Sequence, residues 1–116
     1  MRGETSWNDA RAFCQRICLN GDLVSIKDKD MMDFIQDKVS LPDDVWLAGL
    51  KKYGYWTWYW VDGTEWNYSK WGSGQPDTWS TSYNAIRLSK SNFHWYNTPS
   101  YYATYYTPLC QCKPGS

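Results

Sequence analysis

The sequence predicts an α+β fold, and three observations lead to this prediction. Apolar residues recur at helical spacing in two segments near the N-terminus, whereas the later periodic segments alternate as strands do. A long segment without periodicity interrupts these strands. One pair of cysteines lies in the first helical segment and a second pair in the last strand. Two helices followed by a run of strands are typical of α+β domains.

The two helices are expected near residues 7–18 and 29–39. Thr5 or Ser6 can cap the first helix, and Asp28 or Asp30 can begin the second. The expected apolar face of the first helix is Trp7, Ala10, Cys14, Ile17 and Cys18, and that of the second is Met31, Phe34, Ile35 and Val39. Pro42 prevents the second helix from continuing.

The strands are expected in the remaining periodic segments. These are residues 23–26, 45–50, 56–60, 83–88, 93–95 and 105–113. Residues 64–82 contain no periodic element. A loop of that length in a compact domain is usually functional.

The cysteine spacing predicts two adjacent disulfides between the first helix and the last strand. Cys14 and Cys18 are about 6 Å apart along a helix, and Cys110 and Cys112 are about 6.8 Å apart along a strand. We favour Cys14–Cys110 with Cys18–Cys112, and the crossed pairing is the next choice. A zinc site of four thiolates is the alternative, although neither pair has the usual zinc-knuckle gap. Two long-range bridges would place the protein in an oxidising, extracellular compartment.

Length and charge exclude several classes of function. The 116 residues leave room for a single domain, which we expect to span residues 1–116. The formal net charge is zero, so nothing steers the chain toward nucleic acid or an anionic membrane. No apolar run approaches the length of a membrane span. The sequence has one histidine and no nucleophile set of the Ser/His/Asp or Cys/His kind, which argues against an enzyme.

Aromatic residues must supply much of the core. They make up 19% of the chain, and five of the nine tryptophans lie between residues 56 and 77. One small core needs fewer, so some rings should be exposed and mark a binding surface. The rings expected in the core are Trp46, Trp58, Trp60 and Trp95, whereas Trp66, Tyr68 and Trp71 can belong to core or site.

Six segments, in this order and spacing, resemble landmarks of the C-type lectin-like domain, from Ser6 to Lys113. They lie at residues 6–14, 21–26, 46–50, 58–63, 75–77 and 109–110, and include Trp46-Leu47-Ala48-Gly49-Leu50 and Gln75-Pro76-Asp77. The resemblance implies an α+β fold with a long surface loop. It also implies a short form that lacks the first strand of the family.

The resemblance implies a sugar site at the end of the long loop. In the family a calcium ion in this loop holds a sugar, and the Gln-Pro-Asp motif goes with galactose-type sugars. Trp79 lies where galactose-binding members carry a tryptophan that stacks on the sugar. The sugar-binding residues implied here are Gln75, Asp77, Trp79 and Asn97, and the metal ligands implied are Gln75, Asp77 and Asn97.

The departures from the family predict that calcium binding is weakened or lost. Three usual ligand positions, for a glutamate, an asparagine and an aspartate, hold Tyr83, Tyr96 and Asn97 here. Calcium prefers six to eight oxygens with several carboxylates, so Ca²⁺ would bind weakly. The family's second disulfide is also missing, with Ala85 and Ser100 in place of its cysteines.

The resemblance therefore leads us to expect a secreted lectin that binds glycans, including microbial surface sugars in innate recognition. The alternative is a metal-independent module that binds a protein through aromatic surface, for which the tyrosines of residues 101–106 are candidates. The missing first strand would leave the closing strand with an open edge, which predicts a homodimer through that strand. Asn67-Tyr68-Ser69 is an N-glycosylation sequon.

Overall fold

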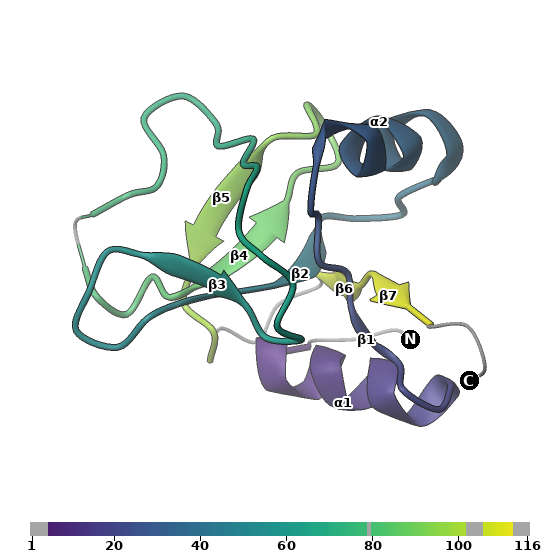
Figure 1. The fold of residues 1–116 in the computed structure, drawn as a ribbon. Helices are drawn as coiled ribbons and strands as arrows, with labels where there is room; N and C mark the ends of the chain where they lie inside the picture. The colour runs from purple at the N-terminus through teal and green to yellow at the C-terminus, as the bar shows by residue number, and fades with distance from the viewer. Residues whose placement is uncertain (1–4, 79, 102–105, 113–116) are drawn as a thin grey trace.

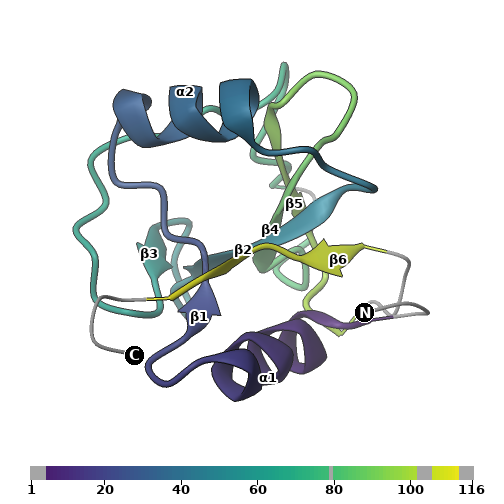
Figure 2. The same ribbon diagram turned by 90° about the vertical axis from the view of Figure 1, so that its right-hand side faces the viewer.

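The computed structural model describes residues 5–78, 80–101 and 106–112, and it confirms the α+β fold. The helices are α1 (Trp7–Ile17) and α2 (Lys29–Lys38). The strands are β1 (Asp22–Leu23), β2 (Val45–Lys51), β3 (Trp58–Trp60), β4 (Ala85–Leu88), β5 (Trp95–Thr98), β6 (Thr107–Pro108) and β7 (Cys110–Gln111). Figures 1 and 2 show the strands between the two helices, with α1 on one side and α2 on the other. None of the described helices is long and apolar enough to cross a membrane.

The main sheet is built around β2, whose first five residues are buried. Its order is β3-β2-β4-β5 with antiparallel pairing, and β6 adds to β2 in parallel. β1 and β7 form a separate antiparallel pair. The single closing strand expected over 105–113 is therefore wrong in the described part, where β6 and β7 are separate. Pro108 lacks the N–H that would continue a ladder. The dimer expected through the closing strand stays a prediction.

The first helix forms where its capping signal predicts it. The Ser6 hydroxyl accepts a hydrogen bond from the Asp9 N–H at 3.3 Å and so satisfies one of the unpaired groups of the first turn. Trp7, Ala10 and Cys14 are buried on one face. The Trp7 indole also donates to the Leu47 carbonyl at 2.8 Å, which ties α1 to β2.

The second helix begins at its expected cap, and its core face differs from the expected one at two positions. The Asp28 carboxylate accepts from the Met31 N–H at 2.9 Å. Met32 and Ile35 are the buried residues, whereas Phe34 is 57% exposed. Phe34 was therefore predicted wrongly, because a residue two positions from Met32 lies on a different face of the helix.

Two disulfides join the ends of the chain, and they have the pairing that the spacing favours. Cys14 bonds Cys110, and Cys18 bonds Cys112, so α1 and the residue after it are linked to β7 and the residue after it. None of the four cysteines is free. Gly21 lets the chain pass beside these bridges, because a Cβ atom there would lie 2.5 Å from the Cys18 sulfur.

Candidate functional site

The long loop, residues 61–84, leaves β3 and returns to β4, and it rests on a cluster of aromatic rings. This aromatic cluster consists of Trp58, Trp60, Trp66, Tyr68, Trp71 and Trp95. Trp95 is fully buried at its centre and contacts four of the other rings, with centroids 5.6–6.0 Å apart. The aromatic residues of the loop that the sequence left undecided therefore pack on the core and support the loop from beneath.

Burial within this cluster affects one titratable group. Loss of solvent raises the pKa of the Tyr68 hydroxyl, and the nearby Asp33 carboxylate raises it further. Tyr68 therefore stays neutral at physiological pH, when its ring packs against Trp95 at 5.9 Å. The ring serves as a neutral packing surface for the loop.

The returning half of the loop runs along β5 through backbone hydrogen bonds. The Trp95 N–H donates to the Lys70 carbonyl at 2.8 Å, and the Gly72 N–H donates to the Trp95 carbonyl at 2.9 Å. A Cβ atom on Gly72 would lie 2.7 Å from the Tyr96 ring, so only glycine fits here without a shift. These contacts direct the next residues of the loop, including Gln75-Pro76-Asp77, toward the end of β5.

Asn97 of β5 then fixes the loop with its side-chain amide. Its Oδ1 accepts from the Asp77 N–H at 2.7 Å, and its Nδ2 donates to the Asp77 carbonyl at 2.7 Å. The same Nδ2 donates to the Tyr83 carbonyl at 3.0 Å. The Asn97 N–H donates to the Gln75 Oε1 at 3.2 Å. Asn97 thus joins both ends of the sugar-motif segment to the sheet, Asp77 through its side-chain amide and Gln75 through its backbone N–H. We call these four hydrogen bonds the Asn97 network.

The structure therefore brings together three of the four residues implied for the sugar site. Gln75 and Asp77 are half-buried beside Asn97, and the peptide bond between Gln75 and Pro76 is cis. Trp79 lies outside the described residues.

The other two positions where the chain departs from the family take different roles. The Tyr83 carbonyl belongs to the Asn97 network. The Tyr96 hydroxyl accepts from Asn92 Nδ2 at 2.8 Å, and the guanidinium of Arg87 lies 4.6 Å from its ring.

The donor set at the loop end does not fit a tight calcium site. Calcium needs six to eight oxygens, several of them carboxylates. Asp77 is the only carboxylate in residues 75–84 and in β5, and the described residues contain no group of three acidic, Cys or His side chains that could hold a metal ion. The side-chain oxygens of Gln75 and Asn97 accept backbone hydrogen bonds. The Asn97 amide directs its N–H bonds at two carbonyls that would otherwise be available to a cation.

Replacing Asn97 by aspartate is expected to create a dependence on calcium. The Asn97→Asp variant loses the Nδ2 donor and brings a carboxylate against the Asp77 and Tyr83 carbonyls. We expect stability to fall by about 2–3 kcal/mol in EDTA, because these carbonyls lose their donor and face a negative charge. Calcium should restore part of this loss of stability, because the introduced aspartate completes a cluster of oxygen atoms.

Thermal unfolding of the unchanged protein and of Asn97→Asp, each with EDTA and with calcium, measures this effect. Asn67→Asp is the matched control, since Asn67 is exposed and the substitution adds the same charge. An unfolding temperature of Asn97→Asp equal to that of the unchanged protein in EDTA would contradict the role of the network.

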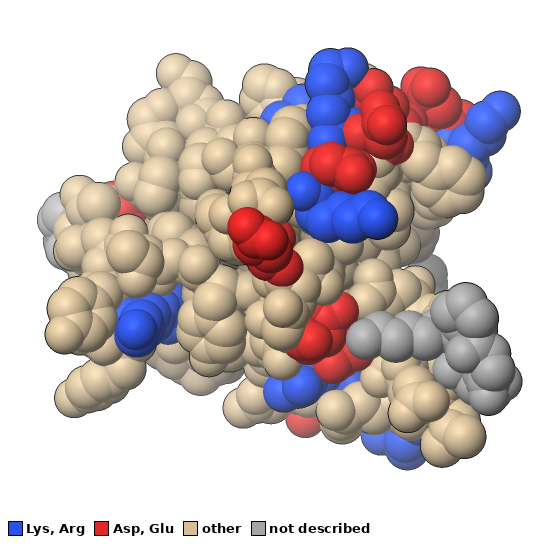
Figure 3. Space-filling view, viewed as in Figure 1, with Lys and Arg blue, Asp and Glu red and all other residues tan. Residues whose placement is uncertain are grey.

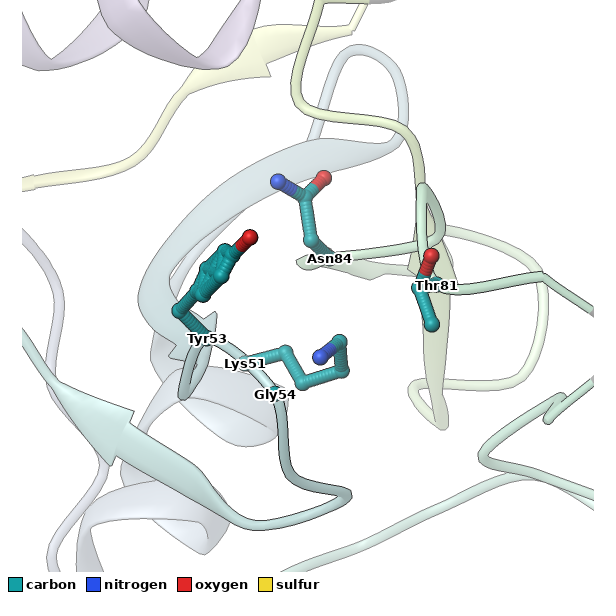
Figure 4. A pocket seen from close by; sticks show the side chains of 5 residues that line it. All are labelled: Lys51, Tyr53, Gly54, Thr81 and Asn84. Atoms are coloured by element: carbon teal, nitrogen blue, oxygen red, sulfur yellow. The ribbon is translucent and has the colours of Figure 1, made fainter.

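A pocket beside this site involves residues that the sequence did not single out. It is lined by Lys51, Tyr53, Gly54, Thr81 and Asn84, with a volume of about 350 Å³ (Figure 4).

The strand expected over 56–60 begins only at Trp58, and Trp56 belongs to an exposed turn. We predicted the strand to begin at Trp56 because aromatic and polar residues alternate after Tyr53-Gly54-Tyr55.

Comparisons with known proteins identify the family of this chain. The family model for the lectin C-type domain matches residues 3–111. A C-type lectin mannose-binding isoform of Oxyuranus scutellatus is 26% identical over 114 residues, which cover 93% of this chain and 71% of that protein. The galactose-specific lectin nattectin of Thalassophryne nattereri is 34% identical over 80 residues, which cover 66% of this chain and 49% of that protein.

Solved structures share the fold at lower identity. A calcium-independent type II antifreeze protein has a TM-score of 0.78 at 22% identity, with 95% of this chain and 81% of that chain covered. The carbohydrate-recognition domain of cow CD23 has a TM-score of 0.75 at 22% identity, with 90% and 78% covered. From its match to the family model over residues 3–111, the chain belongs to the family of C-type lectin domains.

Proposed function

We propose that this domain is a lectin that binds galactose-type sugars at the end of its long loop, through Gln75, Asp77, Trp79 and Asn97. The observation that carries the proposal is the Asn97 network, which holds the Gln75-Pro76-Asp77 segment in one position against β5. A binding segment that is ordered before the ligand arrives loses less entropy on binding. The family and the fold are those of binding modules rather than enzymes.

The preference for galactose rests on the motif and on Trp79. The axial hydroxyl of galactose leaves one ring face rich in C–H bonds, and an aromatic ring can cover that face. The similarity to a galactose-specific lectin supports galactose specificity, whereas relatives named as mannose-binding support mannose specificity. We therefore propose galactose specificity as a property to be tested against mannose.

Calcium contributes little to this proposed site, because the Asn97 network takes over the cross-linking between loop and strand. A weak Ca²⁺ site at Gln75, Asp77 and Asn97 remains compatible with the single carboxylate there.

We further propose that the protein is extracellular, where its two disulfides persist. Asn67 is exposed in the loop, so its sequon is accessible for glycosylation.

Glycan binding with and without EDTA tests the proposed function. We expect galactose-terminated glycans to bind in both conditions and mannose-terminated glycans to bind more weakly. Trp79→Ala should weaken galactose binding about tenfold, because the loss of one stacked ring removes roughly 1 kcal/mol or more. Phe34→Ala is the control, since Phe34 is an exposed ring on α2. Failure to bind any glycan in either condition would refute the lectin and favour a protein-binding module.

A further inference from the structure

We propose that the pocket between the β2–β3 hairpin and residues 81–84 is a second binding site, for the acidic group of a negatively charged saccharide. The ligand would carry a carboxylate or a sulfate on a sugar ring. The site differs from the loop end in its residues, since Lys51 and Tyr53 lie on the hairpin and Thr81 and Asn84 lie on the chain leading into β4.

Four of the side chains that line the pocket carry polar groups, and one of these groups is positively charged. An ammonium, a phenol, a hydroxyl and an amide, from Lys51, Tyr53, Thr81 and Asn84, surround about 350 Å³. Figure 4 shows these side chains around the pocket, with Lys51 and Tyr53 from one segment and Thr81 and Asn84 from the other. This volume lies at the small end of the range for ligand pockets. Closely spaced hydrogen-bonding groups in such a space suit a ligand rich in hydroxyls.

Lys51 is held in place with one N–H bond left for a ligand. Its Nζ donates to the Lys52 carbonyl at 3.1 Å and to the Tyr55 carbonyl at 3.0 Å. The ammonium also lies 5.2 Å from the centre of the Trp56 ring, a favourable cation–π position. An ammonium has three donors. The third is therefore available on a charge that is already fixed in position.

This positive charge has no carboxylate partner in the part of the chain that the structure describes. The ion pairs formed there involve Arg11, Lys29 and Arg87, and residues 51–61 contain no Asp or Glu. Figure 3 shows acidic and basic side chains gathered over α2, whereas the side of the hairpin and long loop is mostly uncharged, with one basic patch and a small acidic one at the edge. An anion approaching Lys51 thus meets no competing negative side chain on the hairpin.

The hairpin also offers aromatic surface for the sugar rings. Tyr53 is 89% exposed and Tyr55 is 61% exposed, and exposed rings grouped in this way mark a binding surface. Tyr53 also borders a second hollow of about 370 Å³, lined further by Lys52, Thr57, Trp58 and Tyr59. A saccharide with its acidic group at Lys51 would extend its neighbouring ring over Tyr53 into this hollow.

Binding of sialyllactose, compared with its uncharged methyl ester, tests the proposal directly. Titrations followed by calorimetry should give at least about tenfold tighter binding of the acid, the usual size of a charge-assisted hydrogen bond. Lactose sulfate in a parallel titration distinguishes a carboxylate from a sulfate as the preferred group. Added salt should weaken the binding of the acids more than that of the ester.

Variants assign the effect to this pocket. Lys51→Gln removes the charge and should abolish the preference for the acid, whereas Lys51→Arg should keep it. Tyr53→Ala should weaken both ligands, and Tyr101→Ala is its control because Tyr101 is also exposed. Equal binding of acid and ester, or a preference that survives Lys51→Gln, would overturn the proposal. Trp79→Ala should leave the preference intact, so failure of the galactose site and failure of this site are distinguishable.

Discussion

Removing both disulfides is expected to lower the free energy of unfolding by about 7 kcal/mol, far more than removing either one. The bridges have sequence separations of 96 and 94 residues, so they close nearly the same loop. The first bridge supplies the loop entropy, about 4.7 kcal/mol for a loop near 100 residues. The second then closes a short ring of residues 14–18 and 110–112, worth about 2.5 kcal/mol. Native domains are stable by only about 5–15 kcal/mol, so this loss is roughly half of the total stability or more.

Three variants separate these contributions. One variant carries alanine at both Cys14 and Cys110, and a second carries alanine at both Cys18 and Cys112. Each should lose about 2.5 kcal/mol of stability, because the remaining bridge still closes the long loop. Replacing all four cysteines should cost about 7 kcal/mol, which exceeds the sum of the two smaller losses by about 2 kcal/mol. Urea unfolding measures the three losses. If the losses of the two single-bridge variants added up to that of the fourfold variant, the shared-loop account would be wrong.

Truncating Trp95 is expected to cause the second-largest loss, about 3–5 kcal/mol. Trp95 is fully buried, and it touches both the rings and the backbone of the long loop. Trp95→Ala should therefore also loosen the loop end and abolish sugar binding there. Trp95→Phe keeps a ring in the cavity and should retain part of both stability and binding.

Trp46 provides a control of the same residue type. It is also fully buried, but it packs against Tyr106 at 5.2 Å and donates to the Thr5 carbonyl, away from the long loop. Trp46→Ala should lower stability by a similar amount and leave the loop end ordered in the folded fraction. Urea unfolding and hydrogen exchange of the Asp77 amide measure the two effects. Equal protection of that amide in the Trp46 and Trp95 variants would show that the aromatic cluster does not support the loop.

The fold followed from local signals because those signals agree with tertiary packing. The Ser6 cap, the apolar run of β2 and the cysteine spacing each correspond to an element or bridge of the structure. Phe34 and Ile17 were misplaced because both are large apolar residues that the structure leaves exposed, and hydrophobicity alone assigns such residues to the core.

The site was only partly predictable, for a different physical reason. The position of Asn97 beside the Gln75-Pro76-Asp77 segment was implied by the family resemblance. Its role depends on the orientation of the side-chain amide, which decides where the Oδ1 acceptor and the Nδ2 donor point. No sequence pattern encodes that orientation. The Lys51 pocket was missed because its residues come from segments 51–54 and 81–84, which meet only in the folded chain.

Hydrogen exchange of the Asp77 amide in EDTA tests most directly the claim that Asn97, rather than calcium, holds the loop. This N–H donates to Asn97 Oδ1 at 2.7 Å. We expect it to exchange slowly in EDTA, with the same protection after calcium is added. Fast exchange in EDTA that becomes slow on saturation with calcium would contradict the claim.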